Sequence, residues 1–154
     1  MKRALYAVAV LAMVAIVGGE DSPADPANEA IVGGWTASRV GDGFPGTTPK
    51  TLTLQFESGG DLTGTLNGQT IDGTYSTSGS SSSSDIRGVT MALTAPVTMT
   101  FTGIYQINGN AMQLEVAPSG IATVTPPDAT AGFGSTKVNG QAQGNAYLSV
   151  LTKN

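Results

Sequence analysis

The sequence predicts an all-β fold, an antiparallel up-and-down meander of about eight to ten short strands that closes into a β-barrel. Three observations predict it: apolar and hydroxyl-bearing residues alternate, glycine-rich turns separate short runs, and no helical spacing repeats beyond the N-terminal apolar run. The clearest alternation lies between Pro96 and Pro118, where Thr98, Thr100, Thr102 and Gln106 share one parity. The opposite, apolar parity carries Val97, Met99, Phe101, Tyr105 and Ile107. Such a strand has one face for a core and one face for water.

Turn-forming segments divide the first half of the domain into short strands. The loop Gly41–Pro49, the segment Glu57–Asp61 and the pair Asn67-Gly68 all contain glycine, which adopts positive φ at little cost. The strands expected between and around these turns are Ile31–Val40, Thr51–Phe56, Leu62–Leu66 and Thr70–Thr77.

The second half begins after a low-complexity segment, Gly79–Ser84, which contains five serines. We interpret this segment as a solvated loop, with a glycan-bearing or flexible binding lip as the alternative. A further turn is expected at Asn108-Gly109. The strands expected here are Val89–Thr94, Val97–Ile107 and Met112–Val116, followed by weaker ones at Ser135–Asn139 and Ala146–Thr152.

A weak internal repeat, Gly-x-Tyr-x-x-x-Gly, joins two of these hairpins. It covers residues 73–79 and 103–109, and residues 134–140 keep the two glycines without the tyrosine. We interpret each copy as a glycine where a strand bends, an inward aromatic ring, and a glycine in the turn. Successive hairpins of this kind form a meander, and closure into a barrel removes its exposed edges.

The chain contains neither cysteine nor histidine. Disulfides, thiolate metal sites and thiol nucleophiles are therefore excluded, and the usual histidine-dependent triads cannot be assembled. The formal net charge is −4, and the seven basic residues are scattered rather than clustered. We expect no cofactor, no metal ion and no nucleic-acid partner, since a nucleic-acid groove needs grouped Lys and Arg.

The N-terminus has the organisation of a secretory signal peptide over residues 1–19. Lys2 and Arg3 precede an apolar run, Ala4–Val17, which ends at two glycines and is too short to span a membrane comfortably. A retained anchor or a buried strand is the alternative. We expect residues 20–30 to form a flexible acidic tether and residues 31–154 to form the barrel domain. This front end resembles that of a bacterial lipoprotein, although it lacks the cysteine that lipidation requires. We expect an exported protein: periplasmic, cell-surface or secreted, without a stable membrane span after cleavage.

The first expected strand carries the residues of a family resemblance. Gly33-Gly34-Trp35, followed by strands with Gly-x-Tyr hairpins, resembles the lipocalin-like domains of exported bacterial proteins. The resemblance implies that Trp35 closes the barrel floor and that Lys153 packs over its ring as the cation. Two features differ from that pattern: no helix is expected beside the barrel, and the last strand is poorly patterned.

The function expected from this resemblance is non-catalytic binding of a small apolar ligand inside the barrel. The residues expected to line or floor the cavity are Trp35, Phe56, Tyr75, Met99, Phe101 and Tyr105. For each of these residues, the alternative is packing in the core without any contact to a ligand. Correspondingly, the alternative function is a solid β-domain that acts as a cell-surface structural or protein-interaction module. An apolar cavity of at least about 300 Å³ would favour ligand binding.

Four carboxylates lie in or beside expected turns: Asp42, Asp61, Asp72 and Asp85. Aspartates in turns commonly accept hydrogen bonds from their own backbone, and that is the interpretation we favour. Calcium binding and carboxylate-dependent hydrolysis of glycans remain as alternatives. The hydrolase requires two carboxylates within about 10 Å in one cleft. We do not expect an enzyme.

Overall fold

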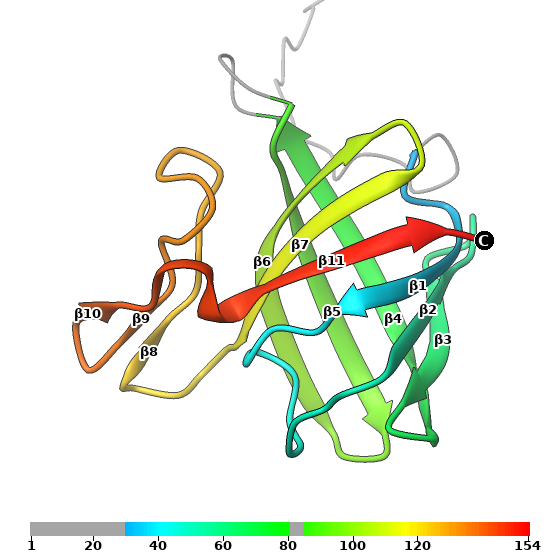
Figure 1. Ribbon diagram of the computed structural model, residues 1–154, viewed down its shortest axis with the longest axis horizontal. Coiled ribbons are helices and arrows are strands. Elements are labelled where there is room, and N and C mark those ends of the chain that lie inside the picture. Colours follow the sequence, from blue (N-terminus) through cyan, green and yellow to red (C-terminus); the bar gives the residue numbers. More distant parts are fainter. Residues whose placement is uncertain (1–29, 81–84) are drawn as a thin grey trace, which may run out of the picture.

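The computed structural model describes residues 30–80 and 85–154. Eight antiparallel strands form a closed barrel in meander order, and this confirms the predicted fold class (Figure 1). The barrel closes because β11 pairs with both β7 and β1. Its strands are β1 (Gly33–Arg39), β2 (Leu52–Phe56), β3 (Asp61–Leu66), β4 (Gln69–Ser80), β5 (Arg87–Ala95), β6 (Met99–Asn108), β7 (Ala111–Pro118) and β11 (Leu148–Lys153).

The expected leader and all but the last residue of the expected tether lie outside the described residues. Residues 81–84 of the expected loop also lie outside them. Over 30–80 and 85–154, no helix combines the length and the apolar character that a membrane crossing needs.

The alternation of residues along the strands fills the barrel interior as expected. On β2 the even-numbered residues are buried, and on β5 the buried positions are Val89, Met91 and Leu93. The neighbouring strands point their buried residues inward at the same level, since Met91 pairs with both Tyr75 and Phe101. The core therefore lies on the axis of the barrel.

Two glycines of the internal repeat stand where the expected bends lie. A Cβ on Gly73 would collide with the backbone of Ala92, and one on Gly103 would collide with the backbone of Glu115. Neighbouring strands therefore approach these points more closely than any side chain allows. The tyrosines two residues later, Tyr75 and Tyr105, are both buried.

Three local predictions were wrong. Val97 is 60% exposed, because residues 96–98 form the connection that lets Leu93 pair with Met99. Residues 79–80, expected in the serine-rich loop, continue strand β4. The turn after β6 has Gly109 and Asn110 as its central residues, since Asn108 already pairs with Ala111.

An insertion lobe, residues 119–147, interrupts the meander between β7 and β11. It contains β8 (Val124–Thr125), β9 (Lys137–Val138) and β10 (Gln141–Ala142), which form a separate three-stranded sheet beside the barrel (Figure 1). The expected strand Ser135–Asn139 is thus reduced to two residues. A 3-10 helix, η2 (Gly144–Tyr147), precedes β11, so the last strand begins two residues later than expected.

The lobe covers the outer wall of the barrel at β6, β7 and β11. Glu115 alternates with the inward residues of β7, yet it is fully buried, and its register partners Ile104 and Leu148 are buried as well. One carboxylate oxygen accepts the Thr136 amide at 3.1 Å and the Thr136 hydroxyl at 2.5 Å. The other accepts the Gly134 amide at 2.5 Å. These three bonds give the buried carboxyl group the hydrogen-bond partners without which its burial would be costly.

Candidate ligand site at one end of the barrel

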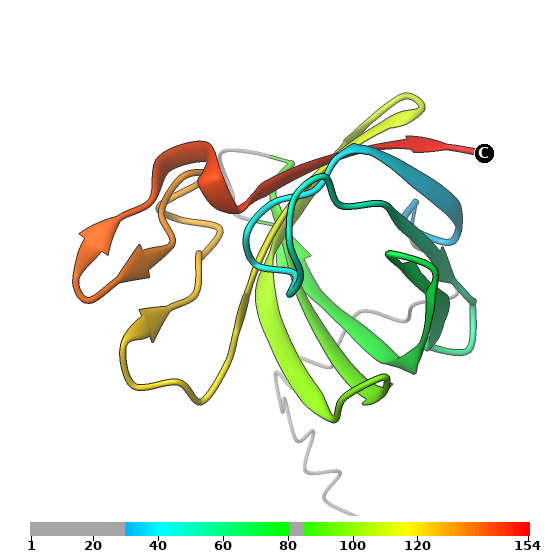
Figure 2. The ribbon, with the colours of Figure 1, turned by 60° about the horizontal axis from the view of Figure 1, so that its bottom comes forward.

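The two ends of the barrel are closed by different parts of the chain. The Trp35 end carries the start of β1, the loop 57–60, the turn 109–110 and the end of β11. The Phe44 end carries the loop 40–51, the turn 67–68 and the connection 96–98. Figure 2 shows the strands as a ring, with the loop 40–51 (cyan) reaching over part of it and the insertion lobe at the side.

At the Trp35 end the sole tryptophan is fixed on two sides. Its indole Nε1 donates a hydrogen bond to the Ile31 carbonyl at 2.7 Å, and the ring is fully buried. The Lys153 ammonium lies 5.4 Å from the ring centroid, which is the contact that the family resemblance implied. Trp35 therefore closes this end as part of the core.

Phe56 and Tyr75 fill the neighbouring space with an edge-to-face pair. Their ring centroids are 4.9 Å apart at an interplanar angle of 84°. The Tyr75 hydroxyl donates to the Glu57 carbonyl at 2.8 Å, in the loop that joins β2 to β3. This proton is therefore used to hold a loop and does not point at a cavity.

At the Phe44 end the core leaves a pocket of about 100 Å³. Every residue that lines it is apolar, and one of them, Val97 in the connection 96–98, is exposed. The lining residues are Phe44, Pro45, Leu66, Ile71, Leu93, Pro96, Val97, Met99 and Phe101.

The six residues expected at a ligand site all belong to the barrel core or pack against it, but only two of them line this pocket. Met99 and Phe101 face the pocket. The other four, Trp35, Phe56, Tyr75 and Tyr105, are packed deeper inside the barrel, each at most 5% exposed. Four further lining residues were not expected at a ligand site: Phe44, Leu66, Ile71 and Leu93. The last three stand on the apolar parities of expected strands.

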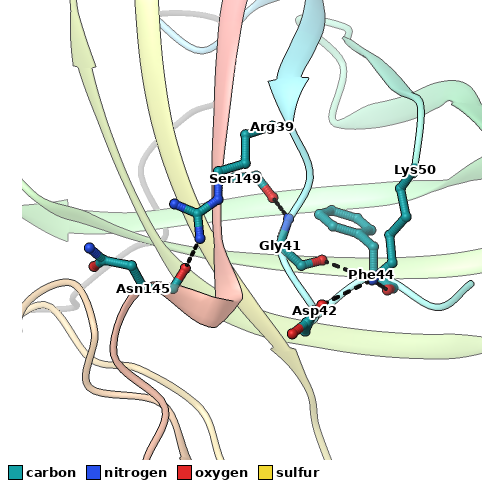
Figure 3. Close-up of polar contacts among 7 residues, drawn as sticks. All are labelled: Arg39, Gly41, Asp42, Phe44, Lys50, Asn145 and Ser149. Carbon is teal, nitrogen blue, oxygen red and sulfur yellow. Dashed lines mark hydrogen bonds and ion pairs between the residues drawn. The ribbon is translucent and has the colours of Figure 1, made fainter. Parts of the chain in front are cut away.

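Phe44 enters the barrel from a loop rather than from a strand. Its side chain is only 2% exposed, and its ring stacks on Phe101 with the centroids 5.6 Å apart. The loop is held by Lys50, whose side chain is 5% exposed. The Lys50 ammonium donates to the Phe44 carbonyl at 2.8 Å and to the Gly41 carbonyl at 3.4 Å, and it pairs with Asp42 at 3.4 Å (Figure 3).

The same loop is fastened to the neighbouring strand β11 and to the 3-10 helix that precedes it. The Gly41 amide donates to the Ser149 hydroxyl at 2.9 Å, and the Asp42 amide donates to the Ala146 carbonyl at 2.8 Å (Figure 3 shows the first of these). Close to this point, the Arg39 guanidinium donates to the Asn145 carbonyl at 2.6 Å. All of these contacts use the backbone or the flanking side chains, and none uses the Phe44 ring.

A second hollow, of about 490 Å³ and open to solvent, lies on the outer wall at β3 and β4. Asp61 and Asp72 both line it. Their register makes them diagonal neighbours, and general sheet geometry places the Cα atoms of such neighbours about 7–8 Å apart. That spacing suits the hydrolase hypothesis, but both side chains are exposed, whereas a general acid is kept protonated by an apolar pocket. Within the described part of the chain, no group of three or more His, Cys, Asp or Glu side chains is placed to hold a metal ion.

The pocket at the Phe44 end is thus the candidate site, an apolar recess closed by one loop. Comparisons with protein-family models, with curated proteins and with solved structures found no match for this chain. The resemblance to lipocalin-like domains therefore stays a prediction from the sequence.

Proposed function

We propose that this protein is an exported, non-catalytic binding protein that takes a small apolar ligand into the pocket at the Phe44 end of the barrel. One observation carries the binding part of the proposal: an all-apolar recess opens at the end of the barrel that a loop closes. Export rests on the basic N-terminus and the apolar run that follows it.

The size of the pocket limits what it accepts as it stands. Its volume, about 100 Å³, is below that of a small-molecule site, which begins at about 300 Å³. An apolar cavity of about 150 Å³ holds benzene or xenon. The recess therefore suits a group smaller than a benzene ring, such as a branched alkyl end. Each buried methylene group of such a ligand contributes about 0.8 kcal/mol.

Titration with xenon and with isobutane, followed by NMR of the methyl groups, tests this proposal. We expect shifts at Leu66, Ile71 and Leu93 with no comparable shift in the insertion lobe. The variant Leu93→Phe fills the recess and should abolish the response. Ile121→Phe adds the same ring at an exposed position and should leave it unchanged. Equal responses in the wild type and in Leu93→Phe would overturn the proposal.

A second function is supported by the packing of the Trp35 end. Trp35, Phe56 and Tyr105 are each at most 2% exposed, so much of the barrel is filled by its own side chains. A barrel of this kind serves as a cell-surface structural or protein-interaction module. This alternative predicts that neither xenon nor isobutane shifts the pocket methyl groups.

A further inference from the structure

We infer that Phe44 is a displaceable plug, whose ring occupies part of the ligand site and sets the size of the ligand that the barrel admits. The inference rests on the proposed function, because it concerns the same pocket. It also names the ligand class: an uncharged, compact apolar molecule larger than the recess alone can hold.

The first step is the origin of the Phe44 side chain. Seven of the other residues that line the pocket belong to β3, β4, β5, β6 or the connection 96–98, whereas Phe44 and Pro45 come from the loop 40–51. The Phe44 ring is inserted from outside onto the face of Phe101. A ring placed in this way can leave without any change in strand pairing.

The second step is that the contacts fixing the loop do not fix the ring. The Lys50 ammonium binds the carbonyls of Gly41 and Phe44, and Ser149 accepts the amide of Gly41. Rotation of the Phe44 side chain about its Cα–Cβ bond therefore leaves these contacts in place. What is lost is the apolar packing against Phe101, and an apolar ligand in the same space restores it.

The third step is a comparison of volumes. A benzene-sized ring needs a cavity of about 150 Å³. Added to the recess of about 100 Å³, the space freed by Phe44 gives a site of about 250 Å³, close to the lower bound for small-molecule pockets. Two fused six-membered rings, or one ring with a short alkyl chain, match this size.

The fourth step is the charge of the ligand. All nine lining residues are apolar, so a charged ligand group would be buried without a partner. Lys50, the cation that holds this loop, is directed at two carbonyls and at Asp42. The ligand is therefore uncharged over the part that enters the barrel.

Naphthalene is the probe that tests this inference, with NMR of the wild-type chain as the main measurement. In the complex we expect contacts between naphthalene and the ring of Phe101, together with loss of the contacts between the rings of Phe44 and Phe101. Naphthalene bound beside an unchanged Phe44–Phe101 pair would overturn the inference, as would the absence of naphthalene binding while xenon still binds.

Variants of the plug supply the second measurement. Phe44→Ala should bind naphthalene about tenfold or more tightly than the wild type, because the ring no longer has to be expelled. Phe44→Leu, which keeps more of the packing, should lie between the two. Phe133→Ala removes a phenyl ring from the insertion lobe and should leave the affinity unchanged. An unchanged affinity in both Phe44 variants would contradict the role of the plug.

The same experiments distinguish a failure of the proposed function from a failure of the inference about Phe44. If the proposed function is wrong, xenon leaves the methyl groups of Leu66, Ile71 and Leu93 unshifted. If only the plug is wrong, xenon shifts them and naphthalene does not displace the Phe44 ring.

Discussion

The two ends of the barrel are each closed by an aromatic ring, but the rings are held in different ways. Trp35 stands on a strand, donates a hydrogen bond through its ring nitrogen and carries the Lys153 ammonium over its face. Phe44 stands in a loop, and its ring makes only apolar contacts while its backbone is tied down. A ring with a polar anchor is part of the scaffold. We propose that the Phe44 ring, inserted from a loop and without such an anchor, can be exchanged for a ligand of similar shape.

The largest expected effect is the loss of the anchored ring. Trp35→Ala should lower the free energy of unfolding by about 3–5 kcal/mol, because it removes a fully buried ring and leaves a cavity. Urea denaturation measures this loss. Val97→Ala, at a position that is 60% exposed, serves as the control and should change the free energy little. A loss below about 1 kcal/mol for Trp35→Ala would remove the contrast between the ends.

The unanchored ring should matter less to stability. Phe44→Ala should lower the free energy of unfolding by about 2–3 kcal/mol, at or below the lower limit of the range for buried phenylalanines. The reason is that the ring borders an existing recess and has no polar contact to lose. The same denaturation series measures this value. A cost equal to that of Trp35→Ala would show that the two ends are equally rigid.

The smallest expected effect is the loss of the positive charge over the Trp35 ring. Lys153→Met keeps much of the aliphatic stem and removes the charge over the indole ring, so it should cost about 0.5–1 kcal/mol. Lys137→Met removes an exposed lysine from the insertion lobe and should cost less. Equal costs for the two variants would mean that the cation adds nothing to the Trp35 end.

The strand positions were predictable because alternation is a local signal. Each barrel strand was expected within a few residues of its bounds, and the inward placement of Tyr75 and Tyr105 followed from their repeat. The burial of Ile104 and Glu115 was not predictable in this way. Both lie on the parity that was expected to face water, and residues of the insertion lobe lie against them. Nothing within a strand records that another segment packs on its outer face.

The pocket was only partly predictable for a related reason. Met99 and Phe101 were expected at a ligand site from their apolar parity, and they line the recess. Phe44 lies in a segment whose glycines and prolines indicate a turn, and turn-forming residues do not show that a ring folds back into the barrel. A recess arises where loop and strands leave space between them, and no residue pattern records that space.

The hydrogen bonds of Glu115 have a consequence for how this protein unfolds. The amides of Gly134 and Thr136 lie in an irregular segment, yet they donate to a side chain rooted in a central barrel strand. Protection from hydrogen exchange follows the stability of the unit to which an amide is bonded. Those two amides should consequently exchange with deuterium as slowly as β7 itself, so that a stretch without regular secondary structure unfolds only when the barrel does.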